Sequence, residues 1–277
     1  LAGSPEGQLP LITSNFFLLE NHPLNNYLKP GLMIRRGGVT VAIAGATTNE
    51  SEYSWAALPG EIKSPNEYVE GWLNGHHADF KIALTHIGKN ADIYLARKTA
   101  GIDLVIGGHT HHPIYKPLLS LDKYDRHIVP VVQAGSEGWY LGQTVVKLNN
   151  HNFTDITSYN LIPITPELPE DPAVAQLVQQ GLEEVKRQMG VGDLDQVVGE
   201  SAEDYMTYDE RAPIIGNFVA DTMREAAHTD IAIDFGDLYG PGFYKGPILL
   251  KDLLQLQPHS YDFSTRGWSI YTAFVRG

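Results

Sequence analysis

Two apolar runs of this chain each end in a short motif that combines glycine with histidine. Residues 80–84 lead into Thr85-His86-Ile87-Gly88, and residues 103–106 lead into Gly107-Gly108-His109-Thr110-His111. Residues 91–99 between them have helical spacing, so the segment predicts a strand–helix–strand unit with parallel strands. In such a unit the carboxyl ends of both strands meet at one edge of the sheet, where open α/β sheets bind their ligands.

The two motifs predict a metal site at that edge. Glycine lets the backbone turn sharply and come close to an ion, and the two alternate histidines of the second motif present imidazoles from a single loop. One His-x-His motif is a weak signal, but a histidine at the end of a neighbouring strand strengthens it. The alternative is that the histidines lie in loops, where other groups satisfy them, and bind no metal ion.

The composition restricts the classes of partner. The 277 residues suffice for one large domain or two ordinary ones. The formal net charge of −13 argues against nucleic acid as a partner, and the lack of cysteine excludes disulfides and thiolate ligands. No apolar run approaches the roughly 18 residues expected of a membrane span. The chain starts at Leu1 rather than methionine, so we expect a processed, trimmed or partial start.

The rest of the chain predicts two modules separated by a proline-rich boundary. In the first module we expect a hairpin over residues 32–45 that turns at Gly37-Gly38, a helix over 65–74, and strands over 129–134 and 141–148. Four prolines then fall within ten residues, which no regular element tolerates: Pro163, Pro166, Pro169 and Pro172. The second module is expected to contain a helix over 173–189, a strand near 197–199, a helix over 214–227 and a strand over 230–233.

The order of these motifs resembles that of calcineurin-like metallophosphoesterases, and specifically of the 5′-nucleotidase branch. The resemblance is carried by Thr85-His86-Ile87-Gly88, Gly107-Gly108-His109-Thr110-His111 and Val132-Gln133-Ala134-Gly135, and in the second half by residues 211–221, 230–233 and 246–253. It implies an α/β fold: a four-layered β-sandwich flanked by helices, followed by a second α/β domain for the substrate. The expected domains are an N-terminally incomplete metallophosphoesterase domain at 1–165, a linker helix at 166–192 and an incomplete C-terminal domain at 193–277.

The resemblance also implies a pair of divalent metal ions. His86 and His109 match two ligands of one ion, and His111 matches a ligand of the other, whereas His112 has no counterpart. Histidine and carboxylate ligands suit Mn, Zn, Fe or Ni without choosing among them. Asp103 is expected to stabilise the loop beside the histidines, as a carboxylate that orients a ligand does.

The sequence departs from the family pattern at its front end. The family begins with an Asp-x-His pair, a Gly-Asp segment with a bridging aspartate, and an Asn-His-Glu/Asp motif that supplies the acid. None of these precedes Leu9, and we interpret Asn21-His22 and Gly192-Asp193 as coincidental matches. No catalytic residue can therefore be assigned, and the chain by itself should not assemble a dinuclear site.

A second departure lies in the substrate domain. Where the family has a pattern like Asn-x-Gly-Gly-Ile-Arg, residues 234–239 place Asp234, Gly236 and Tyr239 at the expected substrate-binding positions. Tyrosine thus replaces an arginine that would attract an anion, which leaves room for a phosphoester other than a nucleotide. The chain also stops at Gly277, short of the family's base-stacking aromatics.

The resulting expectation is a metal-dependent hydrolase of phosphate monoesters of nucleotides or related small molecules, placed by its family in the periplasm or outside the cell. The alternatives are a non-catalytic binding or structural relative that has lost the catalytic front end, and a single-metal hydrolase or sensor built on the three histidines. The sequence leaves the oligomeric state open.

Overall fold

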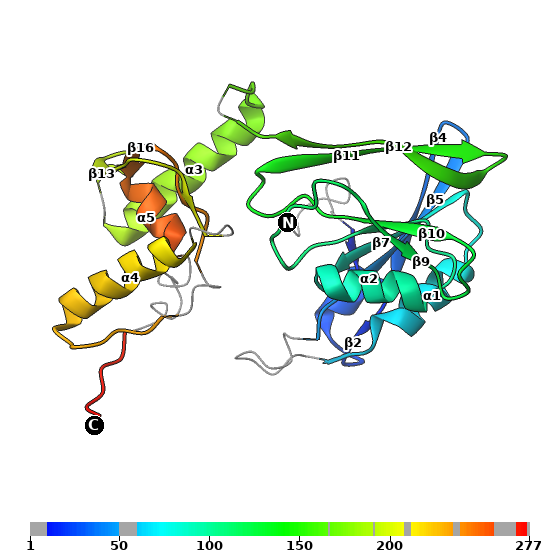
Figure 1. Cartoon of the computed structure of the whole chain (residues 1–277), viewed down its shortest axis with the longest axis horizontal. Coiled ribbons are helices and arrows are strands. Elements are labelled where there is room, and N and C mark those ends of the chain that lie inside the picture. Colours follow the sequence, from blue (N-terminus) through cyan, green and yellow to red (C-terminus); the bar gives the residue numbers. More distant parts are fainter. Residues whose placement is uncertain are drawn as a thin grey trace. The chain divides into compact units, whose positions relative to one another are not determined.

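The computed structural model describes residues 10–49, 60–165, 167–190, 192–207, 212–234, 239–257 and 270–275. The chain divides into two compact units, Leu1–Thr165 and Pro166–Gly277 (Figure 1). None of the helices in the described parts of the chain has the length and hydrophobicity that a bilayer crossing requires.

A six-stranded mixed sheet forms the centre of the first unit. Its strand order is β4 (Gly31–Arg36), β5 (Val39–Thr47), β7 (Phe80–His86), β8 (Leu104–Ile106), β10 (Ile128–Val132) and β9 (Leu118–Leu121). The four inner strands run parallel, and the edge strands β4 and β9 run antiparallel to their neighbours. The expected hairpin is confirmed, since Gly37 and Gly38 form the turn between β4 and β5 with positive φ angles.

Helices α1 (Pro65–Asn74) and α2 (Lys89–Lys98) cover one face of this sheet. Alternate residues of β5 on that face are alanines (Ala42, Ala44 and Ala46), and these small side chains are buried against Val69 and Leu73 of α1. The predicted strand–helix–strand unit is therefore confirmed: β7, α2 and β8 follow one another, and β7 pairs with β8 in parallel.

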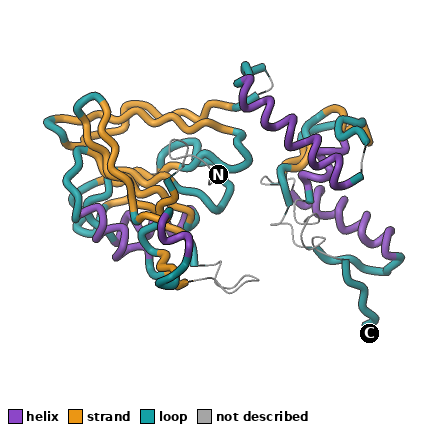
Figure 2. Tube along the Cα trace, turned by 180° about the vertical axis from the view of Figure 1, so that it is seen from behind, coloured by secondary structure: helices purple, strands orange, loops and turns teal. Residues whose placement is uncertain are grey.

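A long hairpin covers the opposite face of the sheet. Strands β11 (Tyr140–Asn149) and β12 (Asn152–Pro163) pair antiparallel with two register shifts. Their apolar side chains pack on Phe80, Leu104 and Val132 of the central sheet. Figure 2 shows the hairpin and the helices on opposite sides of the sheet. The layers are thus hairpin, sheet and helices, which confirms the expected α/β class.

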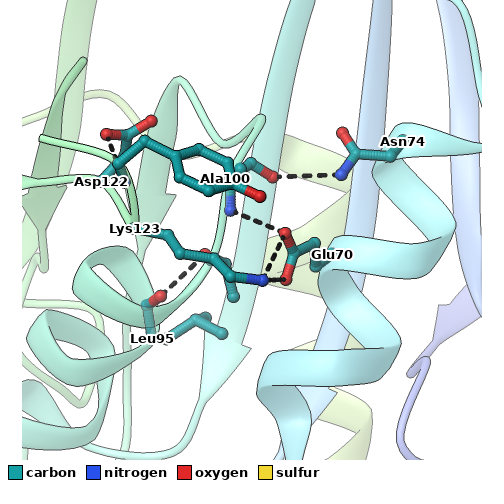
Figure 3. A network of polar contacts seen from close by, with 8 residues as sticks. Glu70, Asn74, Leu95, Ala100, Asp122 and Lys123 are labelled. Atoms are coloured by element: carbon teal, nitrogen blue, oxygen red, sulfur yellow. Dashed lines mark hydrogen bonds and ion pairs between the residues drawn. The ribbon is translucent and has the colours of Figure 1, made fainter. Parts of the chain in front are cut away.

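A polar network fastens the first unit at the far end of α2 (Figure 3). The Glu70 carboxylate of α1 accepts the Ala100 N–H at 3.2 Å and pairs with Lys123 Nζ at 3.3 Å. Nearby, Asp122 Oδ1 accepts three backbone N–H groups, from Tyr124, Arg126 and His127. These carboxylates hold the turn between β9 and β10, away from the strand ends that carry the histidine motifs.

Short elements complete the first unit. They are β1 (Leu11–Ile12), β2 (Phe16–Leu18), the 3₁₀ turn Pro23–Asn26, β3 (Leu28–Lys29) and β6 (Gly60–Ile62). Asn15, which is fully buried, donates to the Thr47 and Lys63 carbonyls and accepts the Thr47 N–H. One amide side chain thereby joins the entry segment to the end of β5.

The second unit is built on helices with two small sheets. It contains α3 (Pro172–Met189), β13 (Val197–Ser201), β14 (Tyr205–Met206), α4 (Ala212–Ala227), β15 (Gly242–Phe243), β16 (Gly246–Leu249) and α5 (Leu250–Leu256). β13 pairs with β16, and β14 pairs with β15. The buried core consists of Ile215, Val219, Phe243 and Leu256. Asp171 caps α3 by accepting the Ala173 and Val174 N–H groups.

One predicted element of the second unit is wrong. Residues 230–233 were expected to form a strand, but they are irregular, and Ile231 and Ile233 are 73% and 82% exposed. No strand among the described residues of this unit pairs with them, so their apolar alternation buries nothing.

Candidate metal centre

The two histidine motifs lie next to each other because their strands are neighbours. Leu84 of β7 is paired with Ile106 of β8, so the segments that follow leave the sheet at the same edge. His86 is the last residue of β7, and His109 follows β8 by three positions. Along β7, Leu84 and His86 share the hairpin face, whereas Ala83 and Thr85 face the helices. Leu84 is 45% exposed, so the hairpin leaves this edge uncovered.

The imidazoles of His86 and His109 are in contact. Their ring centroids are 5.2 Å apart, and the ring planes are inclined by 65°. Partial burial has the largest effect on the pKa of His86 and lowers it. The nearby His109 and His111 imidazoles lower it further. His86 is therefore held in the neutral form at neutral pH, which is the form that binds a metal ion.

Strained backbone presents the histidines of the second motif. His109 and His111 have φ angles of 81° and 59°, a region that residues with a Cβ seldom occupy. The Thr110 N–H bonds to the Gly108 carbonyl at 3.1 Å, which makes a γ-turn centred on His109. Strain of this kind costs on the order of 1–3 kcal/mol per residue and is concentrated at functional sites.

Little space is left for a side chain where this loop passes the first motif. A Cβ at position 108 would lie 3.1 Å from Nδ1 of His86 and 3.3 Å from the carbonyl oxygen of Thr85. Both neighbours would have to move to make room. The absence of a side chain at position 108 therefore eases the close approach of the second loop to the first histidine.

A buried glutamine fixes the far side of the same loop. Gln133, at the end of β10, is 1% exposed. Its Nε2 donates to Thr110 Oγ1 at 3.1 Å and to the His112 carbonyl at 2.9 Å. The sequence placed Gln133 in a family motif without a role, and its role here is to hold the histidine loop.

A buried carboxylate lies beneath both motifs, on the helix side of the sheet. Asp92, in the first turn of α2, accepts the Thr85 hydroxyl through Oδ1 at 2.5 Å. Burial raises the pKa of Asp92 to about 6, against the opposing effects of the Thr85 hydroxyl and His109. Above that pH a negative charge lies within electrostatic reach of His109. The sequence analysis assigned no role to Asp92, although it follows the first histidine motif closely, seven residues after Thr85.

The donor set fits a transition-metal ion in part. Neutral imidazoles from neighbouring loops are suitable ligands for Zn, Mn, Fe or Ni. Within the part of the chain that the structure describes, however, no group of three or more histidine, aspartate or glutamate side chains converges on one point. The described residues therefore bring His86 and His109 together as a pair with His111 nearby, and they supply no bridging carboxylate.

Three other residues singled out in the sequence have different surroundings. Asp103 precedes β8 and accepts the Lys81 N–H at 2.8 Å, so it lies at the opposite end of the strand from the histidine loop. The expectation that it supports that loop is wrong, because the carboxylate beneath the loop is Asp92. His22 accepts the Leu24 N–H at 3.3 Å as the cap of the 3₁₀ turn. Asp193 accepts the Asp195 N–H in a turn.

The expected substrate residues belong to the second unit. Tyr239 Oη donates to Asp234 Oδ2 at 3.1 Å, and Gln257 Nε2 donates to the same oxygen at 3.2 Å. Burial, together with the Asp234 carboxylate, raises the pKa of Tyr239 to about 12. Tyr239 is therefore a neutral phenol at physiological pH. Gly236 lies outside the described residues.

Comparison with known sequences finds relatives of this chain among proteins named nucleotide phosphoesterase and 5′-nucleotidase. No family model matches the chain. The trifunctional nucleotide phosphoesterase protein YfkN of Bacillus subtilis is 30% identical over 302 aligned residues, which cover 98% of this chain and 20% of that protein. The snake venom 5′-nucleotidase of Naja atra is 32% identical over 172 residues, covering 54% of this chain and 32% of the enzyme. The chain thus spans a fifth to a third of the relatives it matches.

Solved structures share the fold. A 5′-nucleotidase precursor from Thermus thermophilus matches 89% of this chain and 52% of its own, with a TM-score of 0.71 and 23% identity. The sulfate thiohydrolase SoxB of the same organism matches 90% of this chain and 45% of its own, with a TM-score of 0.66 and 17% identity. The architecture is therefore that of the two-domain 5′-nucleotidase fold. The resemblance carried by the histidine motifs is confirmed: the chain is a relative of the 5′-nucleotidases in sequence and in fold.

Proposed function

We propose that the chain is part of a metal-dependent phosphoric monoester hydrolase that acts on nucleotides or related phosphate esters. The observation that carries this proposal is the contact between the His86 and His109 imidazoles at the carboxyl edge of the sheet. The names of the sequence relatives support the substrate class, because they include a nucleotide phosphoesterase and several 5′-nucleotidases.

In this proposal His86 and His109 hold one divalent ion, and His111 belongs to the shell of a second. Such ions, when bound, supply Lewis-acid stabilisation of the phosphoryl oxygens and a hydroxide at neutral pH. The chain's own contribution is to position these imidazoles. The low pKa of His86 keeps its ring unprotonated, and the strained turn at His109 fixes the direction of its ring.

We assign substrate contact in the second unit to Asp234 and Tyr239, together with Gly236 from the sequence. Asp234 and Tyr239 present a carboxylate and a neutral phenol, neither of which attracts a phosphate. Both groups can bond sugar hydroxyls or base N–H groups. We therefore propose that Asp234 and Tyr239 recognise an uncharged part of the substrate.

The test is phosphate release from adenosine monophosphate and from p-nitrophenyl phosphate, with manganese or zinc, by the protein as the cell makes it. His109→Ala should lower the turnover at least roughly 100-fold, since loss of a metal ligand removes the ion's stabilisation. His112→Ala is the matched control, because the exposed His112 side chain adjoins the same loop and only its carbonyl is used. Equal turnover in both variants would remove the assignment.

A non-catalytic relative is the second candidate. It is favoured by the lack of a third converging ligand within the described residues. Such a protein would bind a phosphate ester or a metal ion without turnover. Tight binding of adenosine monophosphate by isothermal titration, with no phosphate released in the presence of metal, would select this candidate.

Assignments of the domains and of the location complete the proposal. We propose that residues 1–165 and 193–277 are the metal and substrate domains and that residues 166–192 link them. We also propose export from the cytoplasm, which is supported by the Thermus thermophilus relative being named a precursor. Fractionation of the source cells, with detection by antibody, tests the location.

A further inference from the structure

The buried carboxylate of Asp92 is the feature of the first unit that the proposed function does not yet use. Its side chain is completely buried in the first turn of α2. Oδ1 accepts the Thr85 hydroxyl, whereas Oδ2 has no hydrogen-bond partner among the described residues. An unsatisfied buried oxygen is costly, because it loses its hydration without compensation. The Thr85 hydroxyl compensates only one of the two carboxylate oxygens.

The position of Asp92 connects it to both histidine loops. On one side it bonds Thr85, the residue directly before His86. On the other side its Oδ2 lies against Gly107, and a Cβ at position 107 would overlap this oxygen. Gly107 precedes His109 by two positions, and its N–H bonds the Val132 carbonyl at 2.8 Å. One carboxylate thus touches the base of each loop.

The charge of Asp92 also acts on the site. The Asp92 carboxylate lies within electrostatic reach of His109, which opposes the rise in the pKa of Asp92 that burial causes. The carboxylate lies in the first turn of α2, where the helix dipole favours a negative charge. A fixed negative charge behind an imidazole ligand makes the ligand more basic and offsets part of the charge of a bound cation.

We propose that Asp92 is a positioning residue of the metal site. It fixes the conformation of the His86 and His109 loops through Thr85 and Gly107, and it supplies a negative charge that offsets part of the charge of the bound ion. This inference rests on the proposed metal site and adds a residue to it. Asp92 touches neither ion nor substrate in this role, since it acts from the helix side of the sheet through residues that flank the ligands.

The test is the affinity of the full protein for cobalt(II), measured from the visible absorbance of the bound ion in competition with a chelator. Asp92→Asn keeps the size of the side chain and removes its charge, and we expect it to weaken cobalt(II) binding roughly 10- to 100-fold. Asp122→Asn is the matched control, because Asp122 is also a buried carboxylate but holds the turn between β9 and β10. It should leave the affinity unchanged.

A second pair of variants covers the case in which Asp92→Asn does not fold. Thr85→Val removes the hydroxyl that anchors Oδ1, and we expect weaker cobalt(II) binding and a changed absorbance spectrum. Thr85→Ser restores the hydroxyl and should restore both the affinity and the spectrum. A merely structural role would lower the denaturation midpoint of Thr85→Val without changing the spectrum of bound cobalt(II).

The outcomes separate this inference from the proposed function. If Asp92→Asn and Thr85→Val bind cobalt(II) as wild type does while His109→Ala does not, the positioning role is wrong and the metal site stands. If Asp122→Asn weakens binding as much as Asp92→Asn does, the role is also wrong. If His109→Ala leaves cobalt(II) binding unchanged, the metal site itself is wrong and the role of Asp92 falls with it.

Discussion

At the scale of single residues, the most informative feature is that two histidines occupy backbone conformations that suit glycine. His109 has a φ of 81° and His111 a φ of 59°. This left-handed region raises the free energy of a residue with a Cβ by roughly 1–2 kcal/mol. The His109 imidazole contacts His86 from a loop that Gln133 holds in place.

This strain leads to the first prediction, for His109→Gly. Glycine adopts the same φ without penalty but loses more entropy on folding, so the two effects nearly cancel. We expect the variant to be as stable as wild type or up to about 1 kcal/mol more stable, and to lose metal binding. Urea denaturation and cobalt(II) titration check both parts. A clear loss of stability would mean that packing of the His109 ring, and not metal binding, accounts for the strained backbone at this position.

At the scale of elements, the sequence predicted the parts whose apolar pattern is regular. The β7–α2–β8 unit, the β4–β5 hairpin, α1, α3 and α4 were all recognisable, because each buries a continuous face or ends at glycine. Strand β12 was missed because two register shifts interrupt its pairing with β11 and blur the alternation. Strand β9 was missed because its one buried residue, Ser120, is polar.

The meeting of two histidines was predictable from the sequence, but the residues that support them were not. His86 and His109 come together as expected because parallel strands place their carboxyl ends side by side. Asp92 could not be assigned, since a charged residue in the first turn of a helix usually faces solvent. Asp103 was assigned wrongly because proximity in sequence to the motif does not reveal at which end of a short strand a side chain acts.

A second prediction concerns the ion pair that joins the starts of two strands. His127 Nε2, just before β10, lies 3.4 Å from Asp103 Oδ1, just before β8. The Asp103 carboxylate raises the pKa of His127 above its usual value of 6.5. Because the folded pKa is raised, the stabilisation is fully present below about pH 6.5 and is lost as the pH rises through the folded pKa.

A double-mutant cycle with His127→Gln and Asp103→Asn checks this dependence by urea denaturation. We expect a coupling of about 0.5–1 kcal/mol at pH 6, since both side chains are partly exposed, and almost none at pH 9. The cycle cancels the separate contact of Asp103 with the Lys81 N–H. A coupling that is equal at both pH values would show that the histidine proton plays no part.

At the scale of the whole molecule, the two compact units each have a hydrophobic core. The core of the first unit includes Leu73, Leu95 and Val105, and that of the second includes Ile215, Phe243 and Leu256. Contacts are dense within Leu1–Thr165 and within Pro166–Gly277, with the proline-rich boundary between them. We expect the units to unfold as separate cooperative transitions.

Two matched substitutions test this third prediction. Gly71 in α1 and Gly181 in α3 are both inside helices, and a Cβ added at either would meet no atom within 4 Å. Replacing either with alanine should stabilise its helix by about 1 kcal/mol. In differential scanning calorimetry, Gly71→Ala should raise only one transition and Gly181→Ala only the other. If each variant shifted both transitions equally, the units would form one cooperative block.

The strained histidine loop also bears on how such a sequence changes over generations. Glycine or asparagine at positions 109 and 111 would relieve the backbone, because both residues accept a positive φ more readily. This chain carries histidine at both positions. Histidine at both positions is therefore the costlier choice for the backbone, and a change to glycine or asparagine would exchange an imidazole for a relaxed loop.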